Sequence, residues 1–225
     1  MVAAAHTRAR LALMLLGISV LAAIVGALSS AQQLDLVQRI VARAFISDSE
    51  IEANDARQMF VGLVQTAIAV VNALVFLVWV HGARKALDAL GLQGLRFGPR
   101  WSIGWFFVPF ANLIRPPQII NDIWKGSDPQ NDRSDPTSWR SASTTALVPL
   151  WWGTFLVTDV VGNILLRQPT TTVPQLLQYA QLTLAGDVAG VFPPLLAFLI
   201  VQGIDRRQTA CFALRTAPAP ISPAV

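Results

Sequence analysis

Two carboxylic acids lie inside stretches of the chain that are otherwise apolar, and they are the first candidates for chemistry. They are Asp159 and Asp187, and two amides, Gln65 and Asn163, lie in similar surroundings. An ionised carboxylate is costly away from water, and two that meet could share a proton or bind a cation. The same four polar side chains could instead join helices through hydrogen bonds, or the carboxylates could be hydrated near a membrane surface.

Four stretches that are long and apolar enough to cross a lipid bilayer would position these polar groups. Roughly 20 helical residues, rising about 1.5 Å each, cross a hydrocarbon core of about 30 Å. The stretches are residues 11–28, 59–80, 146–166 and 182–204. Only 13% of the chain is charged, whereas a soluble domain carries about 25%. We therefore predict an all-α membrane protein with a four-transmembrane-helix bundle in one domain, residues 1–208, and a disordered cytoplasmic tail, residues 209–225.

The basic residues indicate which side of the membrane each loop faces. Arg39, Arg43, Arg57 and Arg167 lie on one side of the predicted crossing segments, and the rest of the 17 Lys and Arg residues lie on the other. Basic residues are retained on the cytoplasmic side of a membrane, so both termini are predicted to be cytoplasmic. The basic excess then matches anionic lipid headgroups on that side, and no nucleic acid is expected as a partner.

The first apolar stretch has a second interpretation. Arg8 and Arg10 precede it, and Ser29 and Ala31 follow it in a pattern typical of a signal-peptide cleavage site. The apolar part of a signal peptide has about 7 to 15 residues, which is shorter than residues 11–28. We therefore expect a retained helix, with cleavage as the alternative.

Residues 97–125, between the second and third apolar stretches, contain the most distinctive pattern. The apolar part, residues 101–113, is too short to cross a bilayer and contains Pro109, which breaks a helix. Pro116 and Pro117 could open a further helix that has an apolar face. We therefore expect an interfacial or re-entrant amphipathic segment, which lies in the membrane surface or dips in and returns.

An ordered series of aromatic, glycine, proline and amide residues runs through this segment. It consists of Phe97, Pro99, Trp101, Gly104, Trp105, Phe106, Pro109, Asn112, Leu113, Pro116, Gln118 and Trp124. The series resembles a membrane family known as domain of unknown function 4328, and the resemblance extends loosely over the second to fourth apolar stretches. It implies a multi-pass protein of bacterial, actinobacterial-type origin in the cytoplasmic membrane, and it implies no known activity.

Signatures of catalysis are not found in the sequence. It contains no phosphate-binding glycine loop, no zinc-peptidase motif and no nucleophile elbow. One cysteine and two histidines are too few for a four-ligand zinc site. We therefore expect no catalytic residues, no metal and no cofactor.

The leading prediction is a non-catalytic membrane protein whose residues 97–125 bind lipid, a partner protein or a second copy of the chain. One alternative is a small proton- or cation-coupled transporter or channel subunit that uses Asp159 and Asp187. A second alternative is a membrane-bound enzyme that modifies lipids at the cytoplasmic face.

Overall fold

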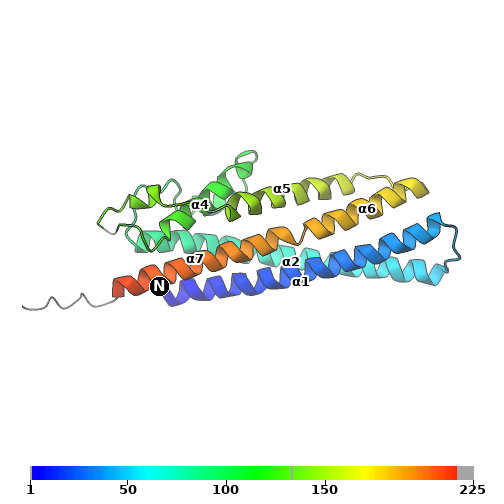
Figure 1. Ribbon diagram of the computed structural model, residues 1–225, viewed down its shortest axis with the longest axis horizontal. Helices are drawn as coiled ribbons and strands as arrows, with labels where there is room; N and C mark the ends of the chain where they lie inside the picture. The colour runs from blue at the N-terminus through cyan, green and yellow to red at the C-terminus, as the bar shows by residue number, and fades with distance from the viewer. Residues whose placement is uncertain (1, 133, 217–225) are drawn as a thin grey trace, which may run out of the picture. The chain divides into compact units, whose positions relative to one another are not determined.

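The computed structural model of the chain describes residues 2–132 and 134–216 (Figure 1). Within those residues the regular structure is entirely helical, which confirms the predicted all-α class. The chain forms two compact units. Unit 1 contains Met1–Leu11, Phe76–Ala146 and Ile200–Val225, and unit 2 contains Ala12–Val75 and Leu147–Leu199.

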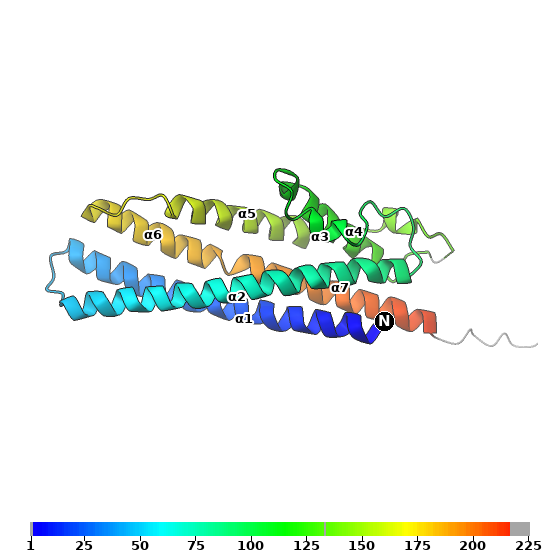
Figure 2. The same cartoon turned by 180° about the vertical axis from the view of Figure 1, so that it is seen from behind.

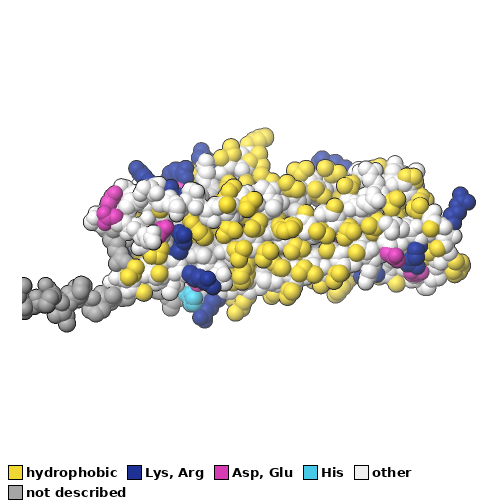
Figure 3. Space-filling view, viewed as in Figure 1, with side chains coloured by type: hydrophobic (Ala, Val, Ile, Leu, Met, Phe, Trp, Pro, Cys, Tyr) yellow, Lys and Arg dark blue, Asp and Glu magenta, His cyan; other side chains and the backbone are white. Residues whose placement is uncertain are grey.

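Four helical segments in the described part of the chain are long and apolar enough to cross a membrane. They are α1 (Val2–Val41), α2 (Asp48–Ala89), α5 (Leu147–Leu165) and the consecutive pair α6 (Val173–Ala189) and α7 (Phe192–Thr216). Large apolar side chains on these helices are exposed, among them Leu21 and Leu63. Hydrophobic side chains also cover much of the face drawn in Figure 3. Such a surface is typical of helices that contact lipid.

α1 and α2 are both longer than the apolar stretches from which they were predicted. α1 continues beyond residues 11–28 because residues 29–41 contain neither glycine nor proline, so nothing interrupts the helical hydrogen bonds. α2 extends beyond residues 59–80 at both ends. It stops just before Gly91, whose φ of 76° suits a glycine that terminates a helix.

Unit 2 is built from antiparallel helix pairs. Within this unit α1 and α2 lie side by side in both views, and α5 packs against α6 (Figure 2). Gly186 of α6 permits a close approach, because Val161 of α5 lies 3.1 Å from the point where a Cβ atom would be. A capping box starts α6, in which the side chains of Thr172 and Gln175 each accept the other's backbone N–H.

The fourth predicted crossing segment, residues 182–204, is interrupted near its middle. α6 ends at Ala189 and α7 begins at Phe192, with Pro193 and Pro194 in the first turn of α7. A proline lacks the N–H that would continue a helix but fits the first turn of a new one. The two prolines therefore account for the break.

The predicted disordered tail, residues 209–225, is wrong for residues 209–216, which are helical. α7 continues to Thr216, because residues 209–216 contain no glycine and no proline. Residues 217–225 lie outside the described part of the chain.

Unit 1 carries the segment that the sequence singled out. The last part of α2 is followed by α3 (Trp101–Gly104), the 3-10 helix η1 (Ala111–Leu113), α4 (Arg115–Gly126) and the 3-10 helix η2 (Ser138–Ser141). Pro109 lies between α3 and η1, and Pro116 and Pro117 open α4, as predicted. The fully buried side chains of the unit include Leu87, Ile119, Ile120, Ile123 and Ile204. The apolar face of α4 therefore packs into the core of unit 1.

Candidate functional site

Two side chains of α2 hold the start of the predicted segment. Arg84, which is buried, donates from Nε to the carbonyl oxygen of Phe97 at 2.6 Å, and its Nη1 pairs with Asp88 at 2.7 Å. His81 donates from Nδ1 to the carbonyl oxygen of Pro99 at 2.9 Å. The backbone that enters the segment is thereby fixed against α2, and the ring of Phe97 is buried.

A buried carboxylate on α4 orients Arg96. Asp122 is 3% exposed and accepts two hydrogen bonds from the Arg96 guanidinium, one from Nε at 2.8 Å and one from Nη2. Such paired hydrogen bonds are the strong form of an arginine–carboxylate contact. They raise the pKa of Arg96 above its ordinary value. The Arg96 side chain nevertheless stays half exposed, so its guanidinium has a fixed orientation and an open side.

A second guanidinium, from Arg115 at the start of α4, lies beside the same aromatic rings. It is 5.7 Å from the ring centroid of Phe97 and 5.5 Å from that of Trp105, which are cation–π distances. Its Nη1 donates to the Gln118 side chain at 3.0 Å. These partners are neutral, and no carboxylate pairs with Arg115 among the described residues.

These side chains form one cleft of about 380 Å³, which we refer to as the arginine–tryptophan cleft. It is lined by Arg96, Phe97, Gly98, Trp101, Trp105 and Arg115. Trp101 is 57% exposed, and its ring lies 5.1 Å from that of Trp105. Because Asp122 neutralises Arg96, one uncompensated positive charge remains, on Arg115. The cleft therefore combines directed N–H donors, a positive charge and exposed aromatic surface.

The turn that follows the cleft exposes large apolar side chains. Phe107, Phe110, Leu113 and Ile114 are all exposed, and Phe110 is exposed to 84%. We refer to these four residues as the apolar turn. Phe110 has φ 61° and ψ −39°, a conformation that is rare for a bulky residue and costs about 1–3 kcal/mol.

The later members of the predicted series lie outside the lining of the cleft. Pro116 is fully buried, and Asn112 lies within η1. The ring of Trp124 packs on α7, 2.6 Å from the point where Gly203 would carry a Cβ atom, and 4.2 Å from the Arg207 guanidinium. The series therefore divides into residues that line the cleft and residues that pack α4 into unit 1.

The predicted polar residues of unit 2 pair with different neighbours. Asp187 accepts a hydrogen bond from the hydroxyl of Ser30 on α1, and Gln65 donates to a backbone carbonyl of α1 at 3.1 Å. Asp159 lies on the exposed side of α5, where the Asn163 side chain reaches it at 3.5 Å. No hydrogen bond joins Asp159 to Asp187 in the described residues, and no cluster of three metal-binding side chains occurs there. The four predicted polar side chains therefore do not form one hydrogen-bonded cluster among the described residues.

Arg96, Arg115 and Asp122 line or orient the site but were not predicted as site residues. A signal was present, since arginines flank a tryptophan-rich stretch that is too short to cross a bilayer. The sequence could not show which of these arginines face the tryptophans. That choice depends on Asp122, which lies 26 residues after Arg96 in the chain.

Residues 42–206 match a family described as "Domain of unknown function (DUF4328)". The match confirms the resemblance that the aromatic and proline series suggested. No curated protein and no solved structure matches the chain. The family description assigns no activity, so the functional argument depends on the geometry of the site.

Proposed function

Because the chain belongs to the family domain of unknown function 4328, we propose a function from its site: a multi-pass membrane protein that binds the phosphate of anionic lipids in the arginine–tryptophan cleft. The role is binding and not catalysis. The four apolar helical segments would cross the bilayer, with both termini and the cleft at the cytoplasmic face. Basic residues are enriched at that face, and anionic headgroups are their usual partners there.

The observation that carries the proposal is the uncompensated charge of Arg115 in a cleft that also exposes the ring of Trp101. Arginine presents a planar array of N–H donors that matches phosphate oxygens. A lipid phosphodiester has a single negative charge, which equals the one positive charge that Asp122 leaves in the cleft. Indole rings such as those of Trp101 and Trp105 favour the headgroup level of a membrane, because they are apolar with one polar edge.

The apolar turn supports a position of the cleft at the membrane surface. Moving an exposed Phe side chain from water into hydrocarbon contributes about 1.5–3 kcal/mol. This contribution is comparable to the cost of about 1–3 kcal/mol for the unusual backbone of Phe110. Insertion of Phe107 and Phe110 would therefore offset the strain and would hold the cleft among the headgroups.

Lipid retention tests the proposal. The full-length protein would be reconstituted in nanodiscs that contain equal amounts of phosphatidylglycerol and phosphatidylcholine, and the lipids that stay bound after detergent extraction would be measured by mass spectrometry. We expect the wild type to retain phosphatidylglycerol selectively. Arg115→Gln should lower that selectivity about tenfold, because one charge-assisted hydrogen bond to phosphate is worth about 1.4 kcal/mol or more.

Arg100→Gln is the matched control. Arg100 is exposed in the same segment but does not line the cleft, so this variant removes the same charge without touching the site. Its selectivity should equal that of the wild type. Undiminished selectivity in Arg115→Gln would contradict the proposal and would favour a protein partner for this surface.

A further inference from the structure

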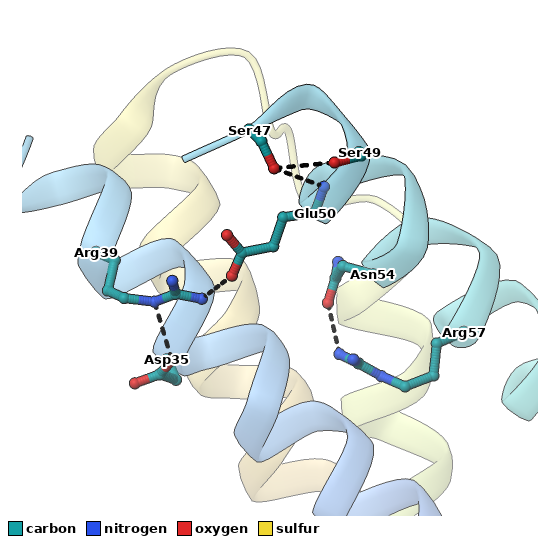
Figure 4. A network of polar contacts seen from close by, with 7 residues as sticks. All are labelled: Asp35, Arg39, Ser47, Ser49, Glu50, Asn54 and Arg57. Carbon is teal, nitrogen blue, oxygen red and sulfur yellow. Dashed lines mark hydrogen bonds and ion pairs between the residues drawn. The ribbon is translucent and has the colours of Figure 1, made fainter. Parts of the chain in front are cut away.

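A second cleft, in unit 2, lies between α1 and α2 near the loop that joins them. Its volume is about 620 Å³, and its charged lining residues are Asp35, Arg39, Glu50 and Arg57. Figure 4 shows the side chains of Arg39 and Arg57 reaching into the space between the helices from opposite sides. None of these residues takes part in the lipid site proposed above.

One end of this cleft carries an excess of negative charge. Arg39 donates from Nε to Asp35 at 3.1 Å and from Nη2 to Glu50, so two carboxylates share one guanidinium. The Asp35 side chain is 69% exposed, and Glu50 is partly exposed. Carboxylate oxygens at this end therefore remain free to accept further hydrogen bonds.

The other end carries an excess of positive charge. Arg57 donates from Nη2 to the side-chain oxygen of Asn54 at 2.6 Å and from Nε to the hydroxyl of Ser29 at 3.2 Å. Both acceptors are neutral. The nearby Asp55 accepts the amide N–H of Asn54 at 3.2 Å, and no carboxylate pairs with Arg57 among the described residues.

We propose that this dipolar cleft binds a zwitterion that combines a phosphodiester with a primary ammonium group, as in a phosphatidylethanolamine headgroup. The phosphate would lie at Arg57, and the ammonium would donate to Asp35 and Glu50. The carboxylates at one end would repel a simple anion, and Arg57 at the other end would repel a simple cation. On α1 the two ends are marked by Ser29 and Asp35, which are six residues apart, or roughly 9 Å along a helix. The side chains at each end reach across part of this distance.

The surroundings of the cleft favour a lipid as the source of this headgroup. Leu28, which lines the cleft, and Met59 and Leu63 on α2 are exposed large apolar side chains. They continue from the cleft along the predicted crossing segments, where acyl chains would lie. The inference rests on the proposed membrane location but not on the lipid site in unit 1.

The discrimination between ammonium types gives a sharp test, since a quaternary ammonium has no N–H to donate. The full-length protein would be placed in nanodiscs of phosphatidylglycerol with equal phosphatidylethanolamine and phosphatidylcholine, and bound lipid would be measured by mass spectrometry. The wild type should enrich phosphatidylethanolamine over phosphatidylcholine about tenfold. Asp35→Asn should bring the ratio close to one, because the primary ammonium loses an acceptor. Arg57→Gln should lower the retention of both lipids, because both carry the phosphate.

Matched variants outside the cleft are Arg167→Gln and Glu52→Gln, which remove the same charges from exposed positions of unit 2. Both variants should keep the wild-type ratio of phosphatidylethanolamine to phosphatidylcholine. Arg115→Gln should also keep this ratio, so the test separates this inference from the lipid site in unit 1. Asp35 is largely exposed, so Asp35→Asn decides the question even if Arg57→Gln fails to fold. Equal retention of the two lipids by the wild type, or a preference that survives Asp35→Asn, would overturn the inference.

Soluble glycerophosphoethanolamine distinguishes the two sources of the headgroup. If it displaces the bound lipid from the wild type, recognition resides in the headgroup alone and a free zwitterion can occupy the cleft. If the lipid preference persists in its presence, the acyl chains are part of the ligand, as the exposed Leu28 and Met59 predict.

Discussion

The two clefts use the same kinds of charged residue but distribute the charges differently. In the arginine–tryptophan cleft of unit 1, the carboxylate of Asp122 is buried and the guanidinium of Arg115 has only neutral partners. In the dipolar cleft of unit 2, Asp35 is exposed and shares Arg39 with Glu50. Burial of the carboxylate leaves one sign of charge for a ligand, whereas its exposure leaves both signs. Under the two proposals, the exposure of the acid, more than the presence of arginine, would determine which headgroup fits.

The largest expected difference between the clefts concerns stability. Asp122→Ala should lower the free energy of unfolding by about 2–3 kcal/mol, because Arg96 then loses a buried carboxylate that accepts two of its hydrogen bonds. The value lies below that for a fully buried pair because Arg96 is half exposed. Asp35→Ala should cost about 0–1 kcal/mol, as surface ion pairs do. Unfolding in mixed micelles measures both, and equal losses would show that the two acids do not differ as described.

Packing beneath the cleft of unit 1 gives the next largest effect. Gly203→Ala should cost about 1–3 kcal/mol, because the Trp124 ring lies 2.6 Å from the position of the new Cβ atom. Gly153→Ala on α5 is the control, since nothing lies within 4 Å of its position. This variant should be neutral or slightly stabilising, as alanine favours a helix. A Gly203→Ala protein as stable as the wild type would mean that Trp124 does not pack tightly on α7.

Coupling between helices of unit 2 should be smaller. A double-mutant cycle with Ser30→Ala and Asp187→Ala should give about 0.6 kcal/mol, the average for a hydrogen bond between membrane helices. A cycle on Asp159 and Asn163 should give a lower value, because these side chains are exposed on one helix and 3.5 Å apart. If the second cycle gave the larger coupling, the exposed face of α5 would be the better place to look for function.

The smallest effect concerns the loop of unit 1 before η2. The hydroxyl and backbone N–H of Thr137 both donate to Asp135 and lower the pKa of that carboxyl. A lowered pKa stabilises the folded loop above the ordinary pKa of an aspartate, and this contribution is lost as the pH falls through the lowered value. The protection factor of the Thr137 amide, which is the intrinsic exchange rate at a given pH divided by the observed rate, should therefore fall on acidification. Thr137→Val should weaken that pH dependence, and an unchanged profile would argue against these hydrogen bonds.

The helices could be predicted from the sequence because their signals are local. Apolar stretches predicted the four helical segments that are long and apolar enough to cross a membrane, and Pro109 and Pro116 predicted a break and a helix start near their own positions. The break at Pro193 was not predicted, because the stretch 182–204 is apolar on both sides of it. The full lengths of α1 and α2 were not predicted, since their polar ends lack the apolar signal and are held by uninterrupted helical hydrogen bonds.

The candidate sites were less predictable because they depend on contacts between distant residues. Phe97, Trp101 and Trp105 lie within a few residues of one another, and one local turn brings them to one cleft. Asp159 and Asp187 lie on different helices, and their meeting depends on how each helix is rotated, which a single sequence does not specify. The contacts of Arg96 with Asp122 and of Arg57 with Ser29 were missed for the same reason.

The most direct test of the account is a structure of the full-length protein in nanodiscs that contain phosphatidylglycerol. We predict a lipid phosphate in the arginine–tryptophan cleft, about 3 Å from the guanidinium nitrogens of Arg115, with the rings of Phe107 and Phe110 in the hydrocarbon. A cleft without lipid, or an apolar turn that faces water or a protein partner, would contradict the proposed function.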